Sequence, residues 1–140
     1  MMQTIQQLRF ASVPENIAVV ERLIDEVRET NGFDELRYGD VLIAMTEAVN
    51  NAIVHGNRLT PGLDVVVDLE IRDGGTLFFR ITDHGPGFDY HSVPDPTAPE
   101  NLEKPNGRGV FLMRQLSDSC EFLDHGRIVE LSFNGVIHEA

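Results

Sequence analysis

Residues 46–57 read TEAVNNAIVHGN and predict a helix whose polar face is unusual. The alanine, valine and isoleucine residues fall at helical spacing, while Glu47, Asn51 and His55 repeat every four residues and so share one face. Asparagine has a low helix propensity, and its amide must be hydrogen-bonded when it is buried. An amide bonded to the core would explain Asn51 alone. A carboxylate, an amide and an imidazole on one face can instead serve a metal ion and a polyphosphate together.

Two strands follow this helix. Residues 65–71 and 77–81 alternate between apolar and polar positions, and the sequence DGG at 73–75 predicts the hairpin turn between them. Asp83 continues the apolar series of the second strand, so we expect its side chain to point toward the covered side of the sheet. A carboxylate in that position needs a partner that offsets its desolvation.

Asp83 also begins the pattern Asp83-x-Gly85-x-Gly87. A strand end followed by a glycine-rich turn would account for these residues without any ligand. The inward carboxylate and the alternate glycines favour a second interpretation, because glycine lets the backbone approach a flat ligand closely. The carboxylate would accept a hydrogen bond from an exocyclic amine such as adenine N6.

A third glycine block, Gly107-Arg108-Gly109, opens a short predicted helix at 109–116. A glycine loop that leads into a helix N-terminus is suited to phosphate. The Rossmann fingerprint is not present, since Leu112 stands where its third glycine belongs. The P-loop is not present either, since the sequence has no Gly-Lys-Ser/Thr. Residues 84–106 hold five of the seven prolines without periodicity, which is typical of a lid or binding loop.

The remaining patterns complete a two-layer α+β sandwich, a mixed but mostly antiparallel sheet with helices on one face. We expect a single domain spanning residues 1–140. Gly56 is expected to cap the second helix, and a capping box at 12–15 to begin the first. The other predicted elements are an edge strand at 4–10, helices at 17–30 and from about 34 or 40 to 55, strands at 119–123 and 128–133, and a turn at 124–127.

Composition narrows the class of protein. The net charge of −12 argues against a direct nucleic-acid binder and favours a basic protein partner. No apolar run reaches the length of a membrane span, and the single cysteine, Cys120, fits a reducing cytoplasm and a core position. The five histidines form no i,i+4 ligand pair, so a zinc site is not predicted. No Gly-x-Ser-x-Gly nucleophile motif occurs.

The order of these three blocks resembles the Bergerat-fold, or histidine kinase-like, ATPases. Within that superfamily the chain is most similar to the small bacterial serine kinases that act as anti-sigma factors, and the likeness covers nearly the whole sequence. It implies ATP and Mg²⁺ as cofactors, phosphorylation of a serine on an antagonist protein of the anti-anti-sigma type, and a sigma factor as competing partner. It also suggests a homodimer, which no residue pattern here indicates.

The resemblance also implies roles for individual residues. Asn51 would ligate Mg²⁺, Glu47 would act as general base or orient the hydroxyl, and Asp83 would accept from adenine N6. Residues 84–106 would be the ATP lid. The other implied nucleotide-binding positions are His55, Gly85, Gly87, Lys104, Gly107, Arg108, Gly109 and Val110.

One pair departs from the family pattern. Gly126-Arg127 stands where the family often has Gly-Thr, so a hydroxyl contact with the nucleotide is lost. Two other functions therefore stay open. The domain could dock a sigma factor or antagonist without phosphotransfer, or it could hydrolyse ATP with water as acceptor.

Overall fold

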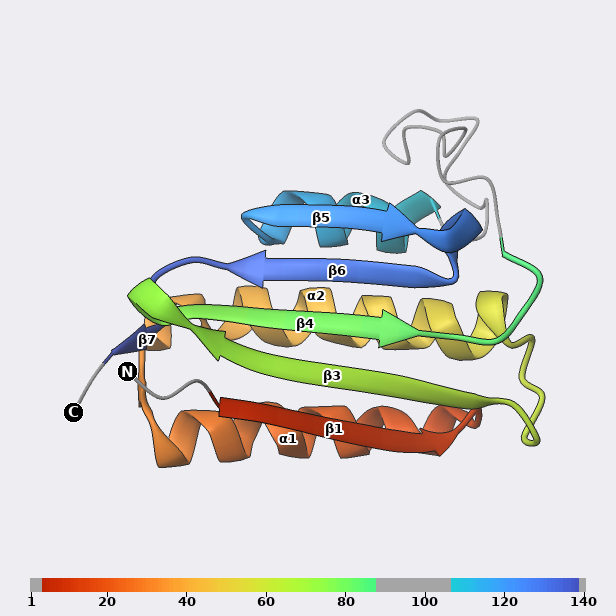
Figure 1. Ribbon diagram of the computed structural model, residues 1–140, viewed down its shortest axis with the longest axis horizontal. Coiled ribbons are helices and arrows are strands. Elements are labelled where there is room, and N and C mark those ends of the chain that lie inside the picture. Colours follow the sequence, from red (N-terminus) through yellow and green to blue (C-terminus); the bar gives the residue numbers. More distant parts are fainter. Residues whose placement is uncertain (1–3, 88–106, 139–140) are drawn as a thin grey trace.

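The computed structural model describes residues 4–87 and 107–138, which form an antiparallel sheet with helices on one face (Figure 1). The strand order is β1-β3-β4-β6-β5, and each neighbouring pair is antiparallel. The strands are β1 (Thr4–Ala11), β3 (Asp64–Arg72), β4 (Thr76–Thr82), β5 (Ser119–Leu123) and β6 (Ile128–Phe133). The helices are α1 (Ile17–Thr30), α2 (Tyr38–Asn50) and α3 (Gly107–Leu116). This architecture confirms the predicted two-layer α+β sandwich.

Short elements lie between the main strands and helices. β2 (Gly32–Phe33) follows α1 and pairs with β7 (Ile137–His138), so that the two strands form a second, separate ribbon. Single helical turns stand before α1 and α2, in the β3–β4 hairpin and in the β5–β6 turn. Their bounds are η1 (Pro14–Asn16), η2 (Glu35–Arg37), η4 (Asp73–Gly75) and η7 (Asp124–Gly126).

The core lies between the sheet and the helices, where both periodicities direct apolar side chains. In β3 and β4 the alternate residues predicted to face inward are buried, and Phe79 packs edge-on against Phe133 with ring centroids 6.3 Å apart. From α1 the stripe Val20, Leu23, Ile24 and Val27 is buried against them. The open face of the sheet carries charged side chains, some of them over Phe78: Arg80 binds Glu130, for example, with Nε 2.7 Å from Oε2.

The second helix changes its winding where the motif residues lie. α2 ends at Asn50, and the chain continues as a π-helix, η3 (Asn51–Gly56), in which the Asn57 N–H donates to the Ala52 carbonyl. The prediction of an uninterrupted α-helix to His55 is therefore wrong in its last turn. Single π turns within helices are frequent at functional sites, and this one begins at Asn51.

Two predicted caps have other roles. Within the described residues the Ser12 hydroxyl accepts no hydrogen bond from a helix N–H, and it donates instead to the Leu63 carbonyl at 2.5 Å. Gly56 is not in the left-handed conformation that favours a glycine cap. It is needed because Asp83 and Gly85 pack directly against it: an added Cβ would lie 2.3 Å from Asp83 Oδ2.

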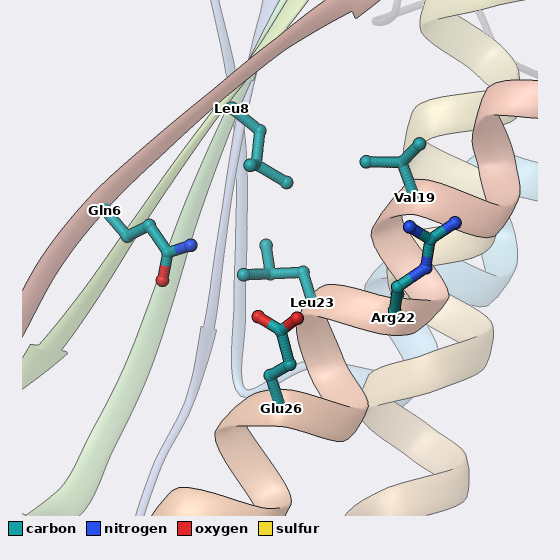
Figure 2. Close-up of a pocket in the computed structure, with 6 residues that line it drawn as sticks. All are labelled: Gln6, Leu8, Val19, Arg22, Leu23 and Glu26. Atoms are coloured by element: carbon teal, nitrogen blue, oxygen red, sulfur yellow. The ribbon is translucent and has the colours of Figure 1, made fainter.

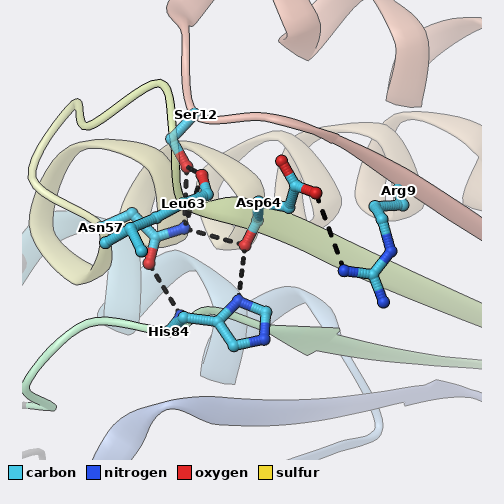
Figure 3. Close-up of polar contacts among 6 residues, drawn as sticks. All are labelled: Arg9, Ser12, Asn57, Leu63, Asp64 and His84. Atoms are coloured by element: carbon cyan, nitrogen blue, oxygen red, sulfur yellow. Dashed lines mark hydrogen bonds and ion pairs between the residues drawn. The ribbon is translucent and has the colours of Figure 1, made fainter.

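A buried asparagine joins the end of this helix to two strands (Figure 3). Asn57 is 1% exposed, and its amide nitrogen donates to Ser12 Oγ at 2.7 Å and to the Asp64 carbonyl at 3.0 Å. Its oxygen accepts from the His84 N–H at 2.7 Å. The His84 ring also bonds the Asp64 carbonyl through Nδ1 at 2.9 Å; because a carbonyl only accepts, Nδ1 carries the proton.

We expect Asn57→Ala to destabilise the domain by about 2–4 kcal/mol, because it removes these bonds and leaves buried donors and acceptors unpaired. Urea denaturation measures the change. The control is Asn134→Ala, which replaces an exposed asparagine and should stay within about 0.5 kcal/mol of wild type. Equal stability of Asn57→Ala and wild type would show that the network contributes nothing net.

Candidate functional site

The fold brings the three sequence blocks together at one end of the sheet and helices. Gly56, at the end of η3, packs against the Asp83 carboxylate. Gly85 packs against the Gly56 backbone so closely that an added Cβ would lie 1.7 Å from the Gly56 carbonyl oxygen. Gly109, in the first turn of α3, faces Glu47: an added Cβ would lie 3.0 Å from Glu47 Oε2. Close approach therefore requires glycine at positions 56 and 85, whereas a side chain at position 109 would only push the Glu47 carboxylate aside.

Asp83 points inward, as predicted, and is 6% exposed. Its Oδ1 accepts a hydrogen bond from the Gly85 N–H at 2.9 Å. Burial raises the pKa of the Asp83 carboxyl, and the Gly85 hydrogen bond opposes that rise. Within the described residues no hydrogen bond reaches Oδ2. One carboxylate oxygen thus bonds the loop backbone, and the other lies against Gly56 without a hydrogen bond to the described residues.

Glu47 and Asn51 are both half-buried and lie one helical turn apart on the exposed side of α2 and η3. Neither side chain makes a hydrogen bond to another residue in the described part of the chain. Because both are half-buried, their polar atoms can bond solvent or a ligand. A single amide oxygen also suits Mg²⁺, which takes one or two protein oxygens and completes its shell with phosphates and waters. The donor set therefore fits a magnesium–nucleotide complex.

The other predicted nucleotide-binding residues differ in how far they are buried. Half-burial lowers the pKa of His55, so its imidazole is neutral at physiological pH. Val110 is fully buried in the core, so its side chain is not available to a ligand. Gly107 is buried at the start of α3, and Arg108 is exposed. Lys104 lies outside the described residues, together with most of the predicted lid; residues 84–87 are its described part.

Sequence reasoning missed two residues that hold the site. Asn57 fixes the His84 N–H, directly after Asp83, and Arg127 donates to the Gly85 carbonyl at 2.8 Å. The family pattern draws attention to Arg127 only because it stands where a threonine is common, and it does not predict these hydrogen bonds. For Asn57 the signal was its place beside Gly56, at the end of a polar-patterned helix.

Cys120 has no nucleophilic character. Burial raises the pKa of its thiol to about 11, so the thiol stays protonated at neutral pH. This agrees with the core position expected from the sequence.

A separate groove lies between β1 and α1 (Figure 2). Both elements contribute apolar and polar side chains to its lining. None of the motif residues lines it, so the groove is distinct from the candidate nucleotide site. The lining residues are Gln6, Leu8, Val19, Arg22, Leu23 and Glu26.

With the fold and this geometry established, the class of protein follows. Residues 10–133 match the family described as the histidine kinase-like ATPase domain, and the chain belongs to that family. The family resemblance drawn from the three blocks is therefore confirmed, and family membership implies the use of ATP. Among residues 4–87 and 107–138, no helix combines the length and hydropathy needed to cross a membrane.

Two proteins named as serine kinases are similar to most of this chain. A protein from Bacillus cereus named Serine-protein kinase RsbW is 25% identical over 130 residues, which cover 88% of this chain and 80% of that protein. One with the same name from Oceanobacillus iheyensis is 25% identical over 121 residues, covering 82% of this chain and 76% of that protein.

A solved structure shares the fold. The crystal structure of the RsbU and RsbW domains of a Mycobacterium tuberculosis protein superposes with a TM-score of 0.62. It is 14% identical to this chain and matches 96% of it, but this chain spans only 32% of that larger one. At this identity the likeness concerns the fold alone.

Proposed function

We propose that this domain is an ATP- and Mg²⁺-dependent protein serine kinase that regulates a sigma factor through an antagonist protein. The observation that carries the proposal is the pairing of Glu47 and Asn51, both half-buried and without a hydrogen bond to the described residues, beside the glycine N-terminus of α3. The names of the RsbW relatives support a serine acceptor.

In the proposed reaction a serine hydroxyl of the partner attacks the γ-phosphorus of ATP. The serine Oγ–P bond forms, the bond from the γ-phosphorus to the β,γ-bridging oxygen breaks, and ADP leaves. Glu47 accepts the hydroxyl proton and orients the oxygen for in-line attack. Asn51 would hold Mg²⁺, which when bound neutralises charge on the phosphates.

The base and the phosphates would bind at opposite sides of this site. Asp83 Oδ2 would accept from adenine N6, while Gly85 and Gly87 admit the ring. At the other side, Gly107 and Gly109 open α3, whose N-terminal N–H groups and dipole favour phosphate. Because the protein is strongly acidic, with a net charge of −12, these local donors are needed to bind an anionic ligand.

Incubation with γ-labelled ATP, Mg²⁺ and a candidate antagonist protein tests the proposal. Label on a partner serine is the expected result. ATP binding without transfer would instead indicate a docking module, and release of labelled phosphate without any partner would indicate an ATPase. A sigma factor is expected to compete with the unphosphorylated antagonist in the same assay.

We expect Asp83→Asn to weaken ATP binding by about ten- to a hundredfold, the worth of one hydrogen bond to a charged group. Gly85 N–H requires the amide oxygen at the Oδ1 position, so the amide nitrogen would face adenine N6, donor against donor. Calorimetric titration measures the affinity. Asp73→Asn, an exposed aspartate in the β3–β4 turn, is the control and should bind like wild type.

The same substitution should stabilise the ligand-free domain at pH 7. Because burial raises the pKa of Asp83 above its unfolded value, stability is full below the unfolded pKa and is lost as the pH rises through the folded pKa. Asparagine avoids this loss, so its advantage over wild type should shrink toward acid pH. Urea unfolding at several pH values measures it. An advantage that does not change with pH would contradict this account of Asp83.

A further inference from the structure

Arg127 connects the β5–β6 turn with the loop that follows Asp83. Its Nε donates to the Gly85 carbonyl at 2.8 Å, and its Nη2 donates to the Pro86 carbonyl at 3.0 Å. Its Nη1 donates to the Asp124 carbonyl at 3.2 Å. The backbone adds a further link, because the Asp83 N–H donates to the Arg127 carbonyl at 2.9 Å. One half-buried guanidinium therefore bonds three carbonyls in two segments.

The two segments that Arg127 joins have unusual backbones and touch each other. Asp124 and His125 have φ values of 49° and 56°, a left-handed conformation that is costly for residues other than glycine. Gly87, with φ of 85°, lies so close to this turn that an added Cβ would be 2.3 Å from the His125 carbonyl oxygen. Such a conformation persists only where surrounding contacts hold it. The guanidinium supplies one of these contacts, at the Asp124 carbonyl, and bonds the facing loop at the Gly85 and Pro86 carbonyls.

We propose that Arg127 is a positioning residue that holds the Asp83–Gly87 loop in the conformation that recognises adenine. The inference rests on the proposed nucleotide function and deepens it. A planar guanidinium can bond neighbouring carbonyls at once, which the single ammonium of lysine cannot do in the same geometry. Arg127 thus fixes the adenine side of the site without touching the phosphate side at α3.

Arg127 also acts on Asp83 through its charge. Among the described residues, His84 and Arg127 lower the pKa of Asp83 through their charges, and Asp124 raises it. Loss of the guanidinium should therefore raise the pKa of Asp83 further. The pH below which protonation of Asp83 weakens ATP binding would then be higher than in wild type.

The test compares ATP, GTP and inorganic tripolyphosphate, each with Mg²⁺, on wild type, Arg127→Gln and Arg127→Lys. We expect both variants to bind ATP about tenfold more weakly and to lose a similar factor of their preference for ATP over GTP. Tripolyphosphate should bind within about twofold of wild type, because it contacts only the phosphate side. Arg80→Gln is the matched control, since Arg80 pairs with Glu130 on the open face of the sheet.

The outcomes separate this inference from the proposed function. Wild type that binds no MgATP would overturn the proposed function and this inference with it. Wild type that binds ATP, with an unchanged ATP-to-GTP ratio in both Arg127 variants, would overturn the positioning role alone. Equal weakening of all three ligands would also overturn it, since that result indicates general destabilisation. Arg127→Lys keeps the charge, so it remains informative if Arg127→Gln does not fold.

Discussion

Glu47→Ala and Glu47→Gln are expected to slow phosphoryl transfer by about a hundred- to ten-thousandfold while leaving MgATP affinity within about twofold of wild type. The reason is that Glu47 acts on the hydroxyl proton of the acceptor and contacts neither adenine nor the metal in the proposed arrangement. Single-turnover transfer from γ-labelled ATP to the partner serine, combined with an equilibrium titration, separates the two quantities.

Two further variants sharpen the Glu47 experiment. Glu26→Gln, which replaces an exposed glutamate on α1, should transfer phosphate like wild type. Gly109→Ala places a methyl group 3.0 Å from Glu47 Oε2, so it should slow transfer by displacing the carboxylate. Normal transfer by Glu47→Ala would show that another group, or no group, takes the proton.

Asn51→Ala should abolish measurable MgATP binding. Even outer-sphere partners of a metal ion contribute about 10–100-fold to its affinity, so loss of the ligand itself should exceed that range. The adjacent Asn50 is also half-buried and supplies the matched control, Asn50→Ala, which should bind MgATP normally. Titration with ATP in EDTA completes the experiment: in the absence of Mg²⁺, wild type and Asn51→Ala should bind ATP with similar, weak affinity. A large difference in EDTA would assign Asn51 to direct contact with the nucleotide instead.

Local periodicity was sufficient to predict most of the fold. The alternation of residues 65–71 and 77–81 determined which faces of β3 and β4 are buried, and the same alternation placed Asp83 inward. These predictions succeeded because each depends on neighbours within a few residues. Burial of one sheet face then fixes the register of the whole hairpin.

The predictions that failed depend on partners far apart in the sequence. Ser12 has the local pattern of a cap, but its hydroxyl bonds Leu63, 51 residues away. Asn57 acts on His84, 27 residues away, and Arg127 acts on Gly85, 42 residues away. No periodicity in a single sequence encodes such pairs. The π-helix at Asn51 was missed for a related reason, since the packing of Gly56 against Asp83 and Gly85 accompanies the change of winding.

The most direct test of the proposed site is a titration with MgATP followed by backbone amide NMR. A single nucleotide between the helix and the strand end should shift amides in three groups, at residues 47–57, 83–87 and 107–110, with one common dissociation constant. Shifts confined to the groove between β1 and α1, or none at saturating MgATP, would contradict the central claim that these segments form one nucleotide site.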